Sequence, residues 1–234
     1  MDFRDIEHIV NKEIKEGLVI TFDLLYSKSV ELLEDYKRIE RWPATLEKMS
    51  ISSNHKQKIV KECVYRVFEE LCEATVEEFG GGKFTEELAD ASLFFMEMLV
   101  ILGFNETEDL VRLVEQRTPN WADSIAVPLT MTTENFIEEI AYLGNFDMEL
   151  EIDDYSFGEE AFNMLSIIGR FGNSLKNRPW RQTKVLTDEN KALDLLSESI
   201  FQFFSFVRFF GGDEILKFIH MKQRVNEFRI RSKY

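Results

Sequence analysis

The stretch EELCEATVEEFGGGKFTEELADASLFFMEMLVILGF, residues 69–104, decides the fold, because it joins two helical patterns through a glycine-rich turn. Leu88–Leu102 is apolar nearly all round, which is typical of a buried helix in a bundle. Before the turn, apolar side chains recur every three or four positions over Val64–Phe79, and Gly80–Gly82 ends that helix. Thr85 is a good N-cap for the next one. Two antiparallel helices joined by a short turn are therefore predicted.

Helical periodicity extends over most of the chain. It predicts further helices over Asp109–Gln116 and Glu159–Lys176, and a third that begins at Thr187 or Asp188 and continues through Phe210. A basic helix closes the chain. With only 11 Gly and 4 Pro in 234 residues, loop-rich β architectures are disfavoured. We predict an all-α fold.

Two halves of the chain resemble each other. Asp90–Phe104 aligns with Ser199–Asp213 without a gap, and both stretches are apolar and end near a glycine. The least regular segment, about Pro119–Phe157, is predicted to contain the join. The domains expected from this are residues 1–125 and residues 126–234.

Composition excludes several classes of protein. The net charge of −15 disfavours general nucleic-acid binding, which needs basic surface to neutralise phosphates. The apolar runs Leu93–Phe104 and Ile200–Phe210 are too short to span a bilayer, so no membrane association is expected. Cys63 and Cys72 lie too far apart on one predicted helix to form a disulfide. The N-terminal residues have no apolar run of the secretory type. We expect a cytoplasmic protein, which for a phage-encoded chain means the host cytoplasm.

Four carboxylates flank the glycine-rich turn. Glu70 and Glu73 are three residues apart on the first predicted helix, as are Glu87 and Asp90 on the second, so each pair shares a face. Antiparallel packing brings both pairs to one level. Four such charges repel each other strongly unless a cation lies among them. Mg²⁺ fits, because it takes hard oxygen ligands and is shared with substrate phosphates.

A solvated acidic surface is the alternative for the first helix, since Glu70 and Glu73 fall away from its apolar stripe. The second helix favours a site. Asp90 and Glu97 lie on nearly the same side of a helix that is otherwise apolar, and a buried unpaired carboxylate is costly. Glu97 is either a further ligand or an acid paired with an arginine, and we favour the arginine pair.

These residues resemble a known family. EELCE (Glu69–Glu73) and EELAD (Glu86–Asp90) are similar to the paired ExxE and ExxD motifs of the all-α nucleoside triphosphate pyrophosphohydrolases. That family includes MazG, the dimeric dUTPases and the phage dUTPases and dCTPases. The resemblance implies Mg²⁺, with Mn²⁺ as a substitute, and Glu70 and Glu73 as catalytic carboxylates. The implied metal ligands are Glu70, Glu73, Glu87 and Asp90.

Two later stretches resemble the phage enzymes of that family. GNSLKNRPWRQTKVLTDEN, residues 172–190, is similar to the loop after their first acidic helix. KQRVNEFRIRSKY, residues 222–234, is similar to their basic C-terminal segment, patterned K-x-x-x-N-x-x-R. Trp180 is either a base-stacking residue or a packing anchor, and Asn226 either positions phosphate or ribose or lies on a plain helix surface. The implied substrate-binding residues are Lys176, Trp180, Arg181, Lys222, Asn226 and Arg229.

Each half departs from the family pattern in a different way. In the second half, Ile167, Arg170, Leu196 and Ser199 stand at the acidic positions, a set that holds no divalent metal. In the first half, a short GGGK hairpin replaces the K-N-R-P-W loop. The last helix of the first half has Gln116, Asn120 and Asp123 at the positions where the family pattern has Lys, Asn and Arg. The economical interpretation is two tandem MazG/dUTPase-like bundle units that form an intrachain pseudo-dimer. The first unit then supplies metal carboxylates, and the degenerate second unit supplies cationic groups.

The resemblance thus implies a Mg²⁺-dependent pyrophosphohydrolase that cleaves a (d)NTP to the (d)NMP and pyrophosphate. By resemblance alone, dUTP is the favoured substrate and dCTP the next. The alternative is a catalytically inert helical nucleotide-binding or interaction protein descended from such enzymes. A ferritin-like di-iron protein is disfavoured, because the E-x-x-H pairs are absent. A homodimer of pseudo-dimers is compatible with the resemblance.

Overall fold

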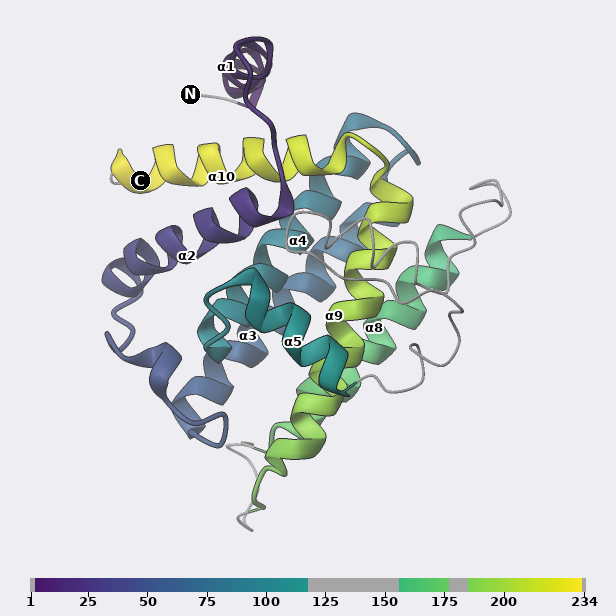
Figure 1. Cartoon of the computed structure of the whole chain (residues 1–234). Helices are drawn as coiled ribbons and strands as arrows, with labels where there is room; N and C mark the ends of the chain where they lie inside the picture. Colours follow the sequence, from purple (N-terminus) through teal and green to yellow (C-terminus); the bar gives the residue numbers. More distant parts are fainter. Residues whose placement is uncertain (1–2, 118–155, 177–184, 233–234) are drawn as a thin grey trace.

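A computed structural model describes residues 3–117, 156–176 and 185–232. These residues form helices and contain no β-strand (Figure 1), which confirms the all-α class for the described parts of the chain. The predicted join near Pro119–Phe157 lies largely outside them. The helices are α1 (Phe3–Lys15), α2 (Phe22–Ile39), the short 3-10 helix η1 (Leu46–Lys48), α3 (Asn54–Ala74), α4 (Gly82–Leu102), α5 (Thr107–Arg117), α8 (Phe157–Ser174), α9 (Glu189–Gly211) and α10 (Ile215–Arg231).

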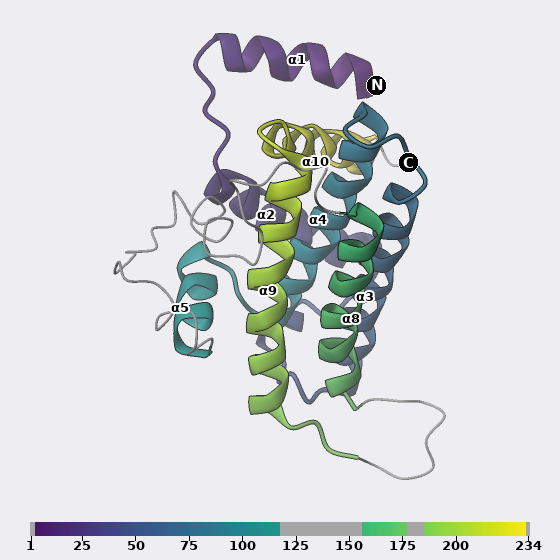
Figure 2. The same ribbon diagram turned by 90° about the vertical axis from the view of Figure 1, so that its right-hand side faces the viewer.

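Four long helices form the centre of the molecule. α3 and α4 pack as one hairpin and α8 and α9 as another, while α3 contacts α8 and α4 contacts α9 (Figure 2). Between the hairpins the Phe95 ring stacks on Phe203 with 4.2 Å between centroids, and meets Phe204 edge-on at 5.6 Å. A Cβ added at Gly169 or Gly172 would lie 3.4 Å from α3 side chains. Glycine at these positions therefore lets α8 approach α3 closely.

Each of the outer helices α5 and α10 follows one hairpin in the chain but packs on the other. α5 follows α4 in the chain but packs on α9, where Ser197 Oγ donates to the Leu113 carbonyl at 3.4 Å. α10 follows α9 but packs on α4 and α2. Gln223 of α10 is buried and donates to the Leu25 carbonyl of α2 at 2.6 Å. Among the described residues, one large core is continuous from Phe22 to Ile219, so both halves share it.

The hairpin between α3 and α4 differs from its prediction at both ends. α3 ends at Ala74 rather than at the glycines, and Phe79 leaves the helical stripe to pack edge-on against Phe84 at 4.9 Å. α4 begins at Gly82, with Gly81 as N-cap. Thr85 is therefore inside the helix, where its hydroxyl donates to the Gly81 carbonyl at 3.2 Å. The extended backbone of Gly81 starts the helix four residues, just over one turn, earlier than a cap at Thr85 would.

The other helix ends agree with the sequence. Gly103 ends α4 with φ of 106° and lies against the Glu47 carbonyl, so a side chain there would be strained and would clash. Asp188 is the N-cap of α9 and accepts a hydrogen bond from the Lys191 backbone N–H. Both cysteines are free, as predicted. None of the described helices is both long enough and apolar enough to cross a lipid bilayer.

Candidate metal centre and adjoining pocket

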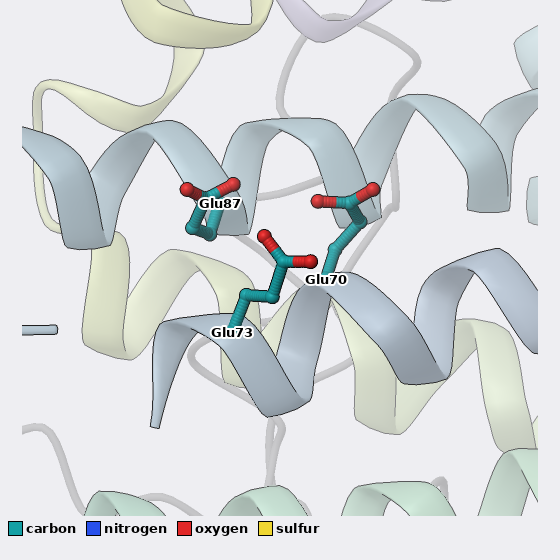
Figure 3. Close-up of side chains that lie close together, drawn as sticks. All are labelled: Glu70, Glu73 and Glu87. Carbon is teal, nitrogen blue, oxygen red and sulfur yellow. The ribbon is translucent and has the colours of Figure 1, made fainter. Parts of the chain in front are cut away.

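Three of the predicted carboxylates meet across the α3–α4 hairpin. Glu70 and Glu73 lie in the last turns of α3, and Glu87 lies in the second turn of α4 (Figure 3). One carboxylate oxygen from each lies within 4.8 Å of the other two. Glu87 is buried, Glu70 is half-buried and Glu73 is exposed. The cluster is therefore anchored in the protein on one side and open to solvent on the other.

The cluster carries more negative charge than its neighbours neutralise. Burial, and then the negative charges of Asp90, Glu73 and Glu87, raise the pKa of Glu70 to about 7. Lys83 of the GGGK hairpin lies 2.7 Å from the Glu87 carboxylate. Among the described residues, Glu70 and Glu73 have no ion pair. A further cation would be stabilised here.

Asp90 lies one turn beyond Glu87 but is turned toward α10. Its carboxylate accepts a hydrogen bond from the Lys222 ammonium, which also lies 2.7 Å from Glu86. Burial raises the pKa of Asp90 although Lys222 opposes the shift. Sequence reasoning placed Asp90 with the other acids and gave Glu86 no part. The structure brings Glu70, Glu73 and Glu87 together and places Asp90 beside them in an ion pair with Lys222.

The donor set fits a hard divalent cation. Carboxylate oxygens are the ligands that Mg²⁺ takes in proteins, and it usually keeps several waters and binds substrate phosphates. The open side at Glu73 leaves room for such ligands. Glu70, Glu73 and Glu87 would hold the cation, and Asp90 is near enough to Glu70 to raise its pKa and so to contribute charge.

A pocket between α2, α4 and α10 adjoins the carboxylates. It is lined by the apolar side chains Leu32, Leu93 and Phe94 and by the polar residues Ser29, Tyr36, Asp90, Glu97 and Asn226. Asp90 therefore borders both the cluster and the pocket. Sequence reasoning missed the contribution of α2, because Ser29 and Tyr36 lie far from the acidic motifs and belong to no motif of their own.

Within the described parts of the chain, Glu97 takes neither of its two predicted roles. It is outside the carboxylate cluster, and among the described residues no arginine pairs with it. Instead it lines the pocket. Burial, and then the charge of Glu40, raise its pKa to about 7.

The predicted substrate-binding residues fall into three groups. Lys222, Asn226 and Arg229 lie at helical spacing on α10. Lys222 contacts Asp90, and Asn226 lines the pocket. The charge of Arg229 lowers the pKa of Tyr36 in the pocket wall. Trp180 and Arg181 lie outside the described residues. Lys176 is the exception.

Lys176 lies at the other end of the bundle from the carboxylates. The preceding carbonyl, of Leu175, accepts from Lys61 Nζ at 2.7 Å. Lys61 is nine residues before Glu70 on α3, which is about 14 Å along a helix axis. The Lys176 ammonium donates to the Asn173 carbonyl in the last turn of the preceding helix, α8, at 3.0 Å. The structure therefore does not bring Lys176 to the cluster.

Comparison with known protein families, with characterised proteins and with solved structures gives no match to this chain. The function therefore has to be inferred from the residues and their arrangement.

The raised pKa of Glu70 gives a prediction for stability without divalent cations. Its pKa lies at about 7 in the native state against 4.5 for an ordinary glutamate, so the native state disfavours the carboxylate form. As the pH rises from 4.5 toward 7, the carboxyl group of Glu70 ionises more readily in the unfolded chain than in the native protein. The free energy of unfolding therefore falls over this pH range. Glu70→Gln, which does not ionise, should be more stable than the wild type at pH 7.5 and equal to it at pH 4.5. We expect about 1 kcal/mol, after discounting for partial exposure, or roughly 2–4 °C in Tm.

Thermal unfolding in a chelator at both pH values measures this difference. Glu78→Gln is the matched control, because Glu78 is exposed in the same hairpin and outside the cluster. A Glu70→Gln variant whose Tm differs from the wild type equally at both pH values would contradict charge repulsion at Glu70.

Proposed function

We propose that the protein is a Mg²⁺-dependent nucleoside triphosphate pyrophosphohydrolase. The observation that carries the proposal is the cluster of Glu70, Glu73 and Glu87, which borders a pocket through Asp90 and in which, among the described residues, only Glu87 has an ion pair. The resemblance of EELCE and EELAD to the paired acidic motifs of the all-α pyrophosphohydrolases supports the same assignment. The favoured substrate is dUTP, followed by dCTP, and this ranking comes from the resemblance.

The reaction adds water to the α-phosphorus and breaks its bond to the bridging oxygen, which leaves with the pyrophosphate. The metal supplies neutralisation of phosphate oxygens and a lowered pKa for a bound water. Glu70 and Glu73 orient the attacking water by accepting its hydrogen bonds. Glu87, held by Lys83 at 2.7 Å, fixes the buried side of the cluster. The pocket beyond Asp90 encloses about 40 Å³ and has to widen to take the nucleoside.

Cationic side chains on α10 bind the triphosphate in this proposal. Lys222 contacts Asp90 at the border between the cluster and the pocket. Arg229 is exposed and has no hydrogen bond or ion pair within the described parts of the chain. Guanidinium groups bind phosphate oxygens in bidentate fashion, and lysine binds them as a point charge. When substrate binds, Lys222 exchanges Asp90 and Glu86 for phosphate.

We also propose that the chain is a pseudo-dimer of two related units. The support is reciprocal packing: α5 of the first unit lies on α9 of the second, and α10 of the second lies on α4 of the first. Phe95 and Phe204, which the repeat aligns, meet at 5.6 Å between the hairpins. At the degenerate acidic positions, Arg170 forms an ion pair with Glu198. The boundary near residue 125 lies outside the described residues.

A panel of nucleoside and deoxynucleoside triphosphates with Mg²⁺ tests the proposed activity. We expect metal-dependent release of pyrophosphate with a nucleoside monophosphate as the other product, and highest turnover with dUTP. Product separation distinguishes this from orthophosphate release. Orthophosphate as the product, or turnover that persists in excess chelator, would contradict the proposal.

The second candidate is an inert, nucleotide-binding descendant of such an enzyme. The Lys222 ion pair with Asp90 and Glu86 favours it, because an internal cation already neutralises part of the acidic site. Calorimetric titration with Mg²⁺, alone and with a triphosphate analogue that resists hydrolysis, separates the candidates when it is combined with the triphosphate panel. The enzyme binds both ligands and hydrolyses the triphosphate, whereas binding of the analogue without turnover of the triphosphate supports the inert descendant.

A further inference from the structure

One carboxyl group in the pocket has no role in the proposed hydrolysis. Glu97 lies on α4, seven residues beyond Asp90, and lines the pocket with Tyr36 and Asn226. Within the described ranges its carboxyl group has neither a hydrogen bond nor an ion pair. Glu97 is half-buried, so its carboxyl group has lost part of the hydration that it would have in water. A ligand that offers hydrogen bonds at this position would offset that loss.

The surroundings of Glu97 determine what such a ligand can offer. The charge of Glu40, the C-cap of α2, raises the pKa of Glu97. Glu97 in turn raises the pKa of Tyr36 on α2 and of Cys63 on α3, and Asp90 lies nearer the cluster on α4. Arg229 of α10 acts on Tyr36 and is not among the groups that perturb Glu97. The nearby charge is negative, so a ligand group that donates hydrogen bonds is favoured over an anion. The triphosphate therefore lies toward α10 and the cluster, and the base lies toward Glu97.

We infer that Glu97 hydrogen-bonds the Watson–Crick edge of the pyrimidine base in this pocket. This inference rests on the proposed function. Proteins that bind a single base commonly combine hydrogen bonds to this edge with apolar and aromatic packing. Phe94, Leu93 and Tyr36 provide such packing beside Glu97.

The chemistry of a carboxylic acid suits both favoured substrates. Uracil presents the N3–H donor beside the O4 acceptor, and cytosine presents the N4 amino donor beside the N3 acceptor. A protonated carboxyl group offers one donor and one acceptor side by side and matches either pair. The pKa of Glu97, which burial raises to about 7, makes this form accessible near neutral pH. Glu97 thus favours a base whose Watson–Crick edge is unmodified, and it does not by itself separate uracil from cytosine.

Substitution of Glu97 combined with a methylated ligand tests the inference. The probes are α,β-imido-dUTP and its N3-methyl counterpart, which lacks the N3–H donor. Glu97→Gln keeps one donor and one acceptor. Glu97→Ala removes both and leaves room for the methyl group. We expect the wild type and Glu97→Gln to prefer the unmethylated probe by about tenfold to a hundredfold. We expect Glu97→Ala to bind the two probes within about twofold.

The same measurements separate this inference from the proposed function. If the wild type hydrolyses dUTP but Glu97→Ala keeps the wild-type preference between the probes, the role of Glu97 is overturned and the proposed function stands. If the wild type binds the probes with the expected preference but hydrolyses no triphosphate, the proposed activity is overturned and the base contact stands. Failure to bind either probe overturns both. A purely structural Glu97 would change affinity for the two probes equally.

Discussion

Glu73→Gln should reduce pyrophosphate release by more than about a hundredfold, and Asp90→Asn by about tenfold to a hundredfold, while the protein stays folded. Even partners that only support a metal ligand typically cost 10–100-fold in affinity or activity when they are changed, so removal of a ligand should cost more. Glu73 contributes an oxygen to the cluster, and Asp90 borders both the cluster and the pocket. The measurement is the initial rate of pyrophosphate release with saturating substrate and Mg²⁺, with circular dichroism to verify the helical fold.

Two controls make this result specific. Glu78→Gln removes an exposed acid from the same hairpin and should keep wild-type turnover. Glu86→Gln removes the second partner of Lys222, which lies 2.7 Å away, and leaves the three-carboxylate cluster intact. It should therefore be affected far less than Asp90→Asn. Wild-type turnover by Glu73→Gln, with metal dependence verified, would remove Glu73 from the site.

The acidic centre was predictable because it depends on local spacing. Glu70 and Glu73 are one turn apart on α3, Glu87 is close to the start of α4, and a short hairpin joins the two helices. Helical periodicity and a tight connection leave few ways to arrange such residues. The early start of α4 at Gly82 did not change this result, because Glu87 and Asp90 keep their spacing within the helix. Local patterns thus predicted the cluster despite an error at the helix boundary.

The pocket depends on long-range packing, which no local pattern reveals. Tyr36, Glu97 and Asn226 come from three helices that are distant in sequence. The turn of Asp90 toward Lys222 also follows from the docking of α10 on α4. The apolar surroundings of Glu97 indicated an unusual acid, but only the packing of α2 shows that it faces a pocket. Likewise, the charge of Lys176 gave no indication that it lies at the far end of the bundle.

Alanine substitutions on α10 should separate two roles of its cations. One role is to bind the triphosphate, and the other is to compete with Mg²⁺ for the acidic side chains. Lys222→Ala and Arg229→Ala should each weaken triphosphate binding and slow turnover by about tenfold to a hundredfold, through loss of a charge-assisted contact of about 1.5–3 kcal/mol. Their effects on Mg²⁺ binding to the free protein should differ. Loss of Lys222 removes a cation that competes for Asp90 and Glu86, so Mg²⁺ affinity should rise. Arg229 contacts neither acid, so its loss should leave Mg²⁺ affinity unchanged.

Calorimetric titrations with Mg²⁺ alone and with α,β-imido-dUTP measure both effects on the full chain. The full chain is needed because the core is continuous through both halves, so a fragment that ends near residue 125 would lose the packing of α9 and α10. Lys217→Ala is the matched control, since Lys217 lies on α10 but pairs with Glu214 at 3.2 Å and Glu7 at 3.9 Å. Unchanged analogue binding in both Lys222→Ala and Arg229→Ala would show that neither side chain of α10 contributes a cation to the site. A rise in Mg²⁺ affinity in Lys222→Ala alone would identify its ammonium as the internal occupant that substrate and metal displace.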